Sequence, residues 1–239
     1  MTEEQPSSGT QAEAQAIDLF RTHGDLLRTG EALRLGIHPS TLYALRDTGR
    51  IVRLSRGLYR LAEAEPLSNP DLAVVASRVP RAVVCLVSAL AFHELTTQIP
   101  RAVDIALPKG AERPRLEHPP LRVFHFSGPA WSEGVEEHRV DGIAVRVYCR
   151  EKSVADACKF RRRLGEDIAL EALKALRQRP GFNVDRLLHY ARICRVERVM
   201  IPYLEALLTG KTFALTWTPG GPWSWAPGQE MGTQPSSQL

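Results

Sequence analysis

Within residues 28–62, the spacing of apolar side chains changes from the period of a helix to the alternation of a strand. Only short turns separate the helical segments from each other and from the β segments. Apolar residues three and four apart predict a short helix at 29–35 and a second helix at 39–48. Two β runs follow, at 51–54 and 58–61, and a three-residue loop ending in glycine joins them as a hairpin. Helix, tight turn, helix and hairpin in this order predict a winged helix-turn-helix.

Particular residues predict the boundaries of the two helices. The hydroxyl of Thr29 is placed to cap the first helix, and Gly36 is suited to the left-handed conformation that ends it. Pro39 fits the first position of the second helix, where its missing N–H costs nothing. Gly49 predicts the end of that helix.

We expect three further features in the N-terminal part of the chain. The first 14 residues are polar without an apolar period, which predicts a disordered lead-in over 1–14. Apolar residues within 14–22 predict one more helix, so that the winged helix domain spans 15–62. Acidic residues and then Ser-Asn-Pro at 63–70 break both periodicities and predict a linker.

The pattern from residue 71 to 208 predicts a second, mixed α/β domain whose C-terminal part is helical, so the fold class is α+β. A capping Asn69 and Pro70 predict a helix through Ser77, and the almost continuous apolar run 83–95 predicts a central buried helix. Asp141-Gly142 between two alternating runs predicts a hairpin. The other expected elements are strands at 102–107 and 121–126, hairpin strands at 135–140 and 143–148, and helices at 151–162, 166–178, 184–194 and about 200–208.

The last segment, 209–239, is rich in Gly, Pro, Ser and Gln and predicts a mostly disordered tail. At 239 residues and 44% hydrophobic, the chain is long enough to bury a real core. It lacks a signal peptide pattern and an apolar run of membrane-spanning length, so we expect a cytoplasmic protein without a membrane partner.

The positive charge of residues 17–62 and the outward-facing polar residues of the second helix favour double-stranded DNA as a partner. We expect the second helix to enter a major groove and the hairpin to contact phosphates. Residues 17–62 hold eight Arg and four Asp or Glu, a net charge of +4 that equals the formal charge of the whole chain. Leu42 and Leu45 define the buried side of the second helix. The residues that we expect to contact DNA are Ser40, Thr41, Tyr43, Ala44, Arg46 and Asp47 on the helix, and Arg50, Arg53, Ser55 and Arg56 on the hairpin.

Two catalytic arrangements deserve comparison with this interpretation. Ser88, His93 and Asp156 are the residue types of a triad, but Ser88 and His93 are five apart and do not share a helix face. Asp104 and Lys109, with Glu112, resemble part of a metal-dependent nuclease site, although a proline and a turn interrupt that strand. We expect no enzyme activity.

The sequence also predicts neither a metal site nor a cofactor. The histidines at 118, 125 and 138 lie on separate β segments without metal-ligand spacing. The four cysteines, Cys85, Cys149, Cys158 and Cys194, form no C-x-x-C pair, and we expect them to be buried thiols.

Several segments together resemble one protein family. They are RGLYRL at 56–61, SALAFHEL at 88–95 followed by IPRAVDIAL at 99–107, and VYCREKSVADACKFRRRLGEDIALEAL at 147–173. In this order they resemble the AbiEi antitoxins of abortive-infection type IV toxin–antitoxin systems, over residues 15–208. The resemblance implies a winged-helix transcriptional autorepressor whose C-terminal domain counters a nucleotidyltransferase-like toxin.

We therefore expect a sequence-specific DNA-binding repressor that acts as an antitoxin. One alternative is a winged helix fused to a nuclease-like domain. Another is an interaction module that does not bind DNA.

Overall fold

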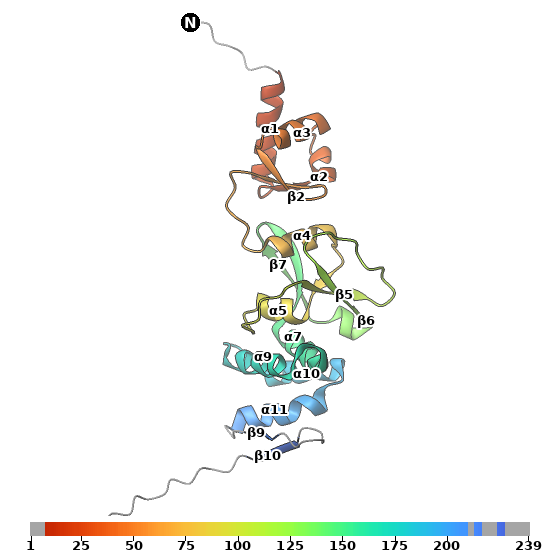
Figure 1. The fold of residues 1–239 in the computed structure, drawn as a ribbon, viewed down its shortest axis with the longest axis vertical. Coiled ribbons are helices and arrows are strands. Elements are labelled where there is room, and N and C mark those ends of the chain that lie inside the picture. Colours follow the sequence, from red (N-terminus) through yellow and green to blue (C-terminus); the bar gives the residue numbers. More distant parts are fainter. Residues whose placement is uncertain (1–7, 210–212, 217–223, 228–239) are drawn as a thin grey trace, which may run out of the picture.

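The computed structural model describes residues 8–209, 213–216 and 224–227, and these residues form three successive layers along one long axis. Figure 1 shows the winged helix at one end, a β-sheet domain in the middle and a group of helices at the other end. The mixed α+β class predicted from the sequence is confirmed.

The N-terminal domain packs three helices on a small sheet. Its elements are α1 (Ser8–Thr22), β1 (Leu26–Arg28), α2 (Thr29–Arg34), α3 (Pro39–Asp47), β2 (Ile51–Ser55) and β3 (Leu58–Leu61). The strands are antiparallel in the order β1-β3-β2. Phe20, Leu27, Leu42 and Leu45 are completely buried between helices and sheet. The predicted winged helix is thereby confirmed, with β1 as a strand that the sequence pattern did not reveal.

The helix boundaries agree with the glycine and proline signals and differ at one cap. Gly36 has φ +92° after α2, and Pro39 occupies the first turn of α3. However, Arg28 and not Thr29 is the N-cap of α2, and no side chain caps it. The amide of Thr29 instead donates to the carbonyl of Gly57, because β1 pairs with the wing strand up to the helix start.

The expected disordered lead-in is wrong for residues 8–14. Helix α1 begins at Ser8, and Ala16, Ile17 and Phe20 bury its apolar face in the domain core. Gln, Ala and Glu between residues 11 and 15 are good helix formers, so the polar segment extends a helix that the core already stabilises. Residues 1–7 lie outside the described residues.

The middle layer is a five-stranded mixed sheet in the order β6-β5-β4-β8-β7. Its strands are β4 (Val83–Val84), β5 (Val103–Pro108), β6 (Leu121–Phe126), β7 (Val135–Val140) and β8 (Ile143–Tyr148). Helix α4 (Pro70–Arg78) packs on one face, and the short α6 (Pro129–Ser132) connects β6 to β7. Asp141 and Gly142 have φ +51° and +80°, as the predicted hairpin turn requires.

The single buried helix expected over 83–95 is wrong. Val83 and Val84 instead form β4, between β5 and β8, and only α5 (Leu86–Phe92) is helical. A continuous apolar run fits a strand buried on both faces as well as it fits a buried helix, so its period could not separate the two. The amide of Cys85 donates to the carbonyl of Asp104 and continues the pairing with β5 up to the start of the helix.

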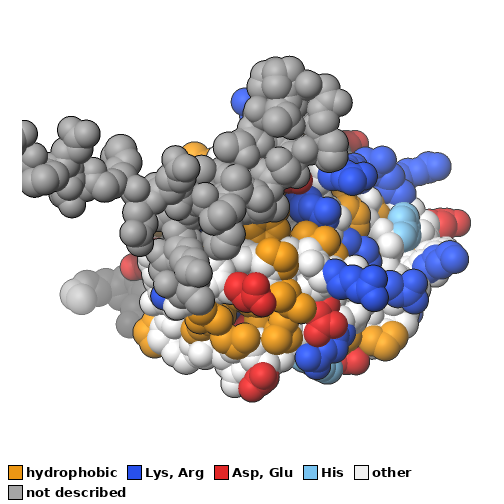
Figure 2. Space-filling model, turned by 90° about the horizontal axis from the view of Figure 1, so that it is seen from below, with side chains coloured by type: hydrophobic (Ala, Val, Ile, Leu, Met, Phe, Trp, Pro, Cys, Tyr) orange, Lys and Arg blue, Asp and Glu red, His pale blue; other side chains and the backbone are white. Residues whose placement is uncertain are grey.

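The last layer consists of helices packed around α7 (Arg150–Lys159). They are α8 (Arg161–Leu164), α9 (Glu166–Gln178), α10 (Val184–Cys194) and α11 (Glu197–Thr209). Helix α11 begins earlier than expected and contains Pro202, which removes one backbone hydrogen bond near the start of the helix. Figure 2 views the molecule from this end and shows basic side chains gathered on one side, next to hydrophobic ones.

The tail that we expected to be mostly disordered contains two short strands. β9 (Phe213–Thr216) and β10 (Ser224–Pro227) pair antiparallel. The rest of the tail from residue 210, including Trp217 and Trp223, lies outside the described residues.

The winged-helix core yields a stability prediction. Leu45 is completely buried, whereas Leu33 on the neighbouring helix is 42% exposed. Leu45→Ala leaves a cavity and should lower the unfolding free energy of this domain by about 2–5 kcal/mol. Leu33→Ala, the matched control, should change it by less than about 1 kcal/mol. Denaturant titration of both variants measures the difference, and equal losses would contradict the packing described here.

Candidate nucleic-acid interface

The exposed face of α3 presents the residues predicted to read bases. Leu42 and Leu45 hold the opposite face against the core, which leaves Ser40, Tyr43 and Arg46 exposed. Asp47 is exposed as well, and Thr41 and Ala44 are partly buried at the edges of this face. A helix anchored in this way presents a rigid polar surface to a partner.

Ser40 takes part in the cap of its own helix. The Nδ1 atom of His38 accepts from the Ser40 amide at 3.3 Å and lies 2.7 Å from the Ser40 hydroxyl oxygen. Since Nδ1 is an acceptor for the amide, the hydroxyl donates to it as well. The oxygen of Ser40 then has only lone pairs to offer a ligand, which suits a base amino group.

Tyr43, Arg46 and Asp47 form a connected group on the same face. The Arg46 guanidinium lies 5.0 Å from the centroid of the Tyr43 ring, and its Nε donates to Asp47 at 2.8 Å. Such exposed contacts contribute little to stability. Their effect is to hold an aromatic ring and a guanidinium side by side at the surface.

The wing carries three exposed arginines, Arg50, Arg53 and Arg56. Nε of Arg53 donates to the carbonyl of Ser55 at 3.3 Å, which folds this side chain along the wing. Gly57 closes the loop with φ +74°. The hydroxyl oxygen of Ser55 is buried and has no hydrogen-bond partner among the described residues, so the wing as folded does not present it to a ligand.

The structure places two arginines beside the wing that the sequence pattern did not single out. Arg78 ends α4, and Arg115 lies in the loop between β5 and β6. With Arg53 and Arg56 they line a cleft of about 690 Å³. Only the tertiary fold brings Arg78 and Arg115 close to the wing, and neither residue belongs to a local sequence motif that predicts this position.

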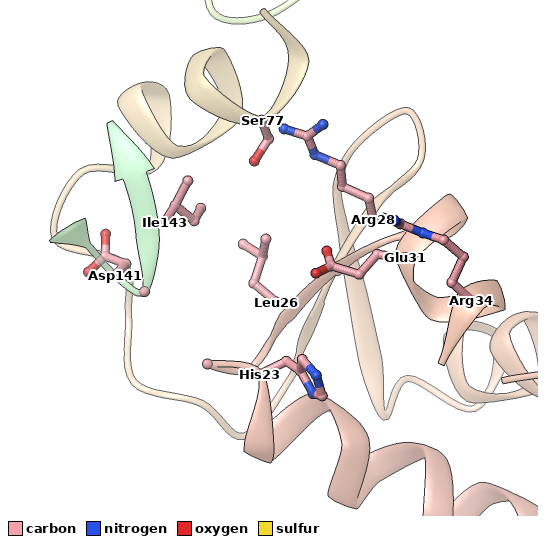
Figure 3. Close-up of a pocket in the computed structure, with 10 residues that line it drawn as sticks. His23, Leu26, Arg28, Glu31, Arg34, Ser77, Asp141 and Ile143 are labelled. Atoms are coloured by element: carbon pink, nitrogen blue, oxygen red, sulfur yellow. The ribbon is translucent and has the colours of Figure 1, made fainter. Parts of the chain in front are cut away.

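A second cavity, of about 340 Å³, lies where the two domains meet (Figure 3). Arg28 and Glu31 enter it from the winged helix, and Ser77 and Asp141 from the second domain. Arg28 donates to the carbonyl of Ala76 at 3.4 Å, and Asp141 accepts from the amides of Ser68 and Asn69. The bond from Arg28 joins the winged helix to α4, and the bonds to Asp141 hold the connecting segment against the β7–β8 turn.

Ser88, His93 and Asp156, which have the residue types of a catalytic triad, lie in separate hydrogen-bond networks. The Ser88 hydroxyl donates to Ala102 and accepts from the Asp104 amide, and His93 Nε2 lies 2.8 Å from the carbonyl of Tyr148. Asp156 is buried and accepts from Lys152 Nζ at 2.6 Å. Each polar group therefore has a structural partner, as is usual for buried side chains.

The nuclease-like set does not converge. Asp104 is fully buried and pairs with Arg122, whose Nη2 donates to it at 2.7 Å, while it also accepts from the Val87 amide. Burial raises the pKa of Asp104, and Arg122 opposes this shift. Lys109 is exposed beyond the other end of the same strand, roughly 16 Å away at about 3.3 Å per residue.

Of the three histidines considered as metal ligands, His118 and His125 are exposed and His138 is partly buried. Within the described part of the chain, no three His, Cys, Asp or Glu residues are placed to hold a metal ion. All four cysteines are buried, and burial raises the pKa of Cys158 to about 12. Protonated, enclosed thiols of this kind are unreactive.

Comparison with known proteins is consistent with the geometry. No helix among the described residues is long and apolar enough to cross a bilayer. The RV2827C protein from Mycobacterium tuberculosis has a similar fold, with a TM-score of 0.52 at 15% identity, over 91% of each chain. No curated protein matches the sequence significantly. Residues 15–62, however, match the family AbiEi_4, described as transcriptional regulator, AbiEi antitoxin, so this segment of the chain is similar to that family.

Proposed function

We propose that this protein is a sequence-specific transcriptional repressor that binds DNA upstream of its own gene, acting in the cytoplasm. The observation that carries the proposal is the exposed face of α3, with Tyr43 and Arg46 side by side, next to a wing with three exposed arginines. The helix has the shape that a major groove admits, and the wing supplies cations for phosphate. The match of residues 15–62 to a family of regulators supports it.

We further propose that the protein acts as the antitoxin of a type IV system and counters a nucleotidyltransferase-like toxin. In this proposal the second domain, residues 71–208, carries the neutralising activity, and it does so without catalysis. Its buried ionisable residues are already paired, which supports a binding role. The same pairing argues against the nuclease alternative.

DNA binding is tested with the upstream region of the gene and a scrambled duplex of equal length. Fluorescence anisotropy at fixed salt should show tighter binding to the upstream region by at least about 10³-fold, the lower end for specific regulators. Equal affinity for both duplexes would overturn sequence-specific repression, and absence of binding to either would favour a pure interaction module.

Base reading by α3 is tested through Tyr43. Tyr43→Ala should lose about 1–3 kcal/mol of discrimination at particular base pairs, because the ring contacts base edges. Binding of the variant to single-base variants of the operator measures this loss. If the variant weakens operator and scrambled DNA by the same factor, Tyr43 contacts the backbone and not the bases.

Phosphate binding by the wing is tested through Arg56. Removal of one phosphate contact should lower the slope of log K against log salt by about one and weaken all sequences alike. Arg198→Ala is the matched control, since Arg198 is exposed on α11 at the opposite end of the molecule. An unchanged slope in Arg56→Ala would count against the wing contact.

The antitoxin and repressor roles are separable by substitution in the full chain. The double variant Tyr43→Ala, Arg46→Ala should lose operator binding but still rescue cells from a co-expressed nucleotidyltransferase-like toxin. Lys109→Ala tests the nuclease alternative, since Lys109 is exposed and its removal leaves the core intact. If the purified protein degrades DNA or RNA and Lys109→Ala abolishes this activity, the protein acts by cleaving nucleic acid and not by binding the toxin.

A further inference from the structure

The cavity where the two domains meet has walls from both of them (Figure 3). Leu26, Arg28 and Glu31 come from the winged helix, and Ser77 and Ile143 come from the second domain. Its volume of about 340 Å³ is at the lower end of the range for small-molecule sites, roughly 300–1,000 Å³. The cavity therefore has room for a small organic ligand.

Two glycines bring the domains into close contact at this cavity. Gly24 follows α1 and Gly142 lies in the β7–β8 turn, and both have positive φ, +79° and +80°. A Cβ atom on Gly142 would lie 3.6 Å from the Cα atom of Gly24. Backbone thus packs on backbone here, which fixes the spacing between the two walls.

Ser77 presents a hydroxyl to the cavity that the fold itself does not use. The residue lies in the last turn of α4 and is only 4% exposed. A helical serine can donate to a carbonyl of the preceding turn, but this hydroxyl has no hydrogen-bond partner within the described part of the chain. Figure 3 shows it directed into the cavity. Because buried polar groups are normally hydrogen-bonded, the free hydroxyl points to a ligand.

The cavity also holds one available charge of each sign. Arg28 donates one N–H to a backbone carbonyl of α4, at 3.4 Å, and a guanidinium has four more. Neither Arg28 nor Glu31 forms an ion pair with another described residue, whereas Asp141 already accepts from two backbone amides. The lining arginines, Arg28 and Arg34, and the two acids sum to two minus two, or zero, without the histidine. This balance matches a ligand that carries both charges.

We propose that this cavity binds a small zwitterion, an α-amino acid with an aliphatic side chain. Arg28 and Ser77 donate to its carboxylate, and Glu31 accepts from its ammonium group. Leu26 and Ile143 contact the aliphatic side chain. Since these groups come from both domains, the bound ligand favours the observed arrangement of the domains over any other. Such binding does not require the repressor function proposed above.

The site is tested by calorimetric titration of the full-length protein, without DNA, with L-leucine, L-valine and L-isoleucine. Two analogues of leucine each lack one charged group: 4-methylpentanoate has no ammonium group, and 3-methylbutylamine has no carboxylate. Leucine should bind at least about tenfold more tightly than either analogue, because each analogue loses a charge-assisted hydrogen bond.

Three variants assign the contacts to residues. Glu31→Gln should bind leucine about tenfold less tightly but 4-methylpentanoate as wild type does, since that analogue has no group for Glu31. Ser77→Ala should weaken leucine and 4-methylpentanoate by the same factor and leave 3-methylbutylamine unchanged. Glu137→Gln is the matched control, because Glu137 is exposed on β7 and does not line the cavity. It should bind all three compounds as wild type does.

Several outcomes would overturn the site. If none of the three amino acids binds wild type at millimolar concentration, the cavity has no such ligand. Equal affinity for leucine and 4-methylpentanoate would contradict the contact with Glu31. If leucine binds but Glu31→Gln and Ser77→Ala keep the wild-type affinity, the ligand binds elsewhere. Matching thermal unfolding curves of the variants exclude misfolding as the cause of a loss. A protein that binds leucine but no DNA keeps this site and loses only the repressor function.

Discussion

The apolar contact between Leu26, Leu58 and Val74 fixes the wing to the second domain, and the arrangement of the candidate DNA surface depends on it. Leu58 is fully buried on β3, the central strand of the small sheet, so it links the wing directly to α4. Burial of each such side chain contributes about 1.5–3 kcal/mol. The hydrogen bond from Arg78 to the carbonyl of Arg56 holds the wing tip from the same side. The wing is therefore supported by both domains.

Local signals were sufficient for much of the N-terminal domain. Gly36 and Pro39 there, and the Asp141-Gly142 turn in the second domain, were predicted correctly because each imposes a backbone conformation within a few residues. The buried and exposed faces of α3 followed from helical spacing, since Leu42 and Leu45 are fully buried and Tyr43 is exposed. These features depend on no distant part of the chain.

Features that depend on distant partners were missed. β1 is three residues long and exists because β3 pairs with it, and β4 is two residues between β5 and β8. The run 83–95 therefore was not one helix. The cleft beside the wing could not be predicted from the sequence for the same reason. Arg78 and Arg115 lie more than twenty residues from Arg56 in the chain, and only tertiary packing brings the two walls of the cleft together.

The charged residues of this protein serve two purposes: buried ions are paired inside the fold, and the excess positive charge lies on the surface of the winged helix. The buried carboxylate of Asp104 pairs with the exposed side chain of Arg122, and the buried Lys152 pairs with the buried Asp156, because a lone ion would be costly to bury. Residues 17–62 carry +4 and all other residues sum to zero, so the excess charge resides in the winged helix. Arg78 and Arg115 add local positive charge at the one side where this excess meets the second domain. Attraction of a polyanion depends on where cations gather rather than on the total charge, and one such group, Arg53, Arg56, Arg78 and Arg115, lies around the wing.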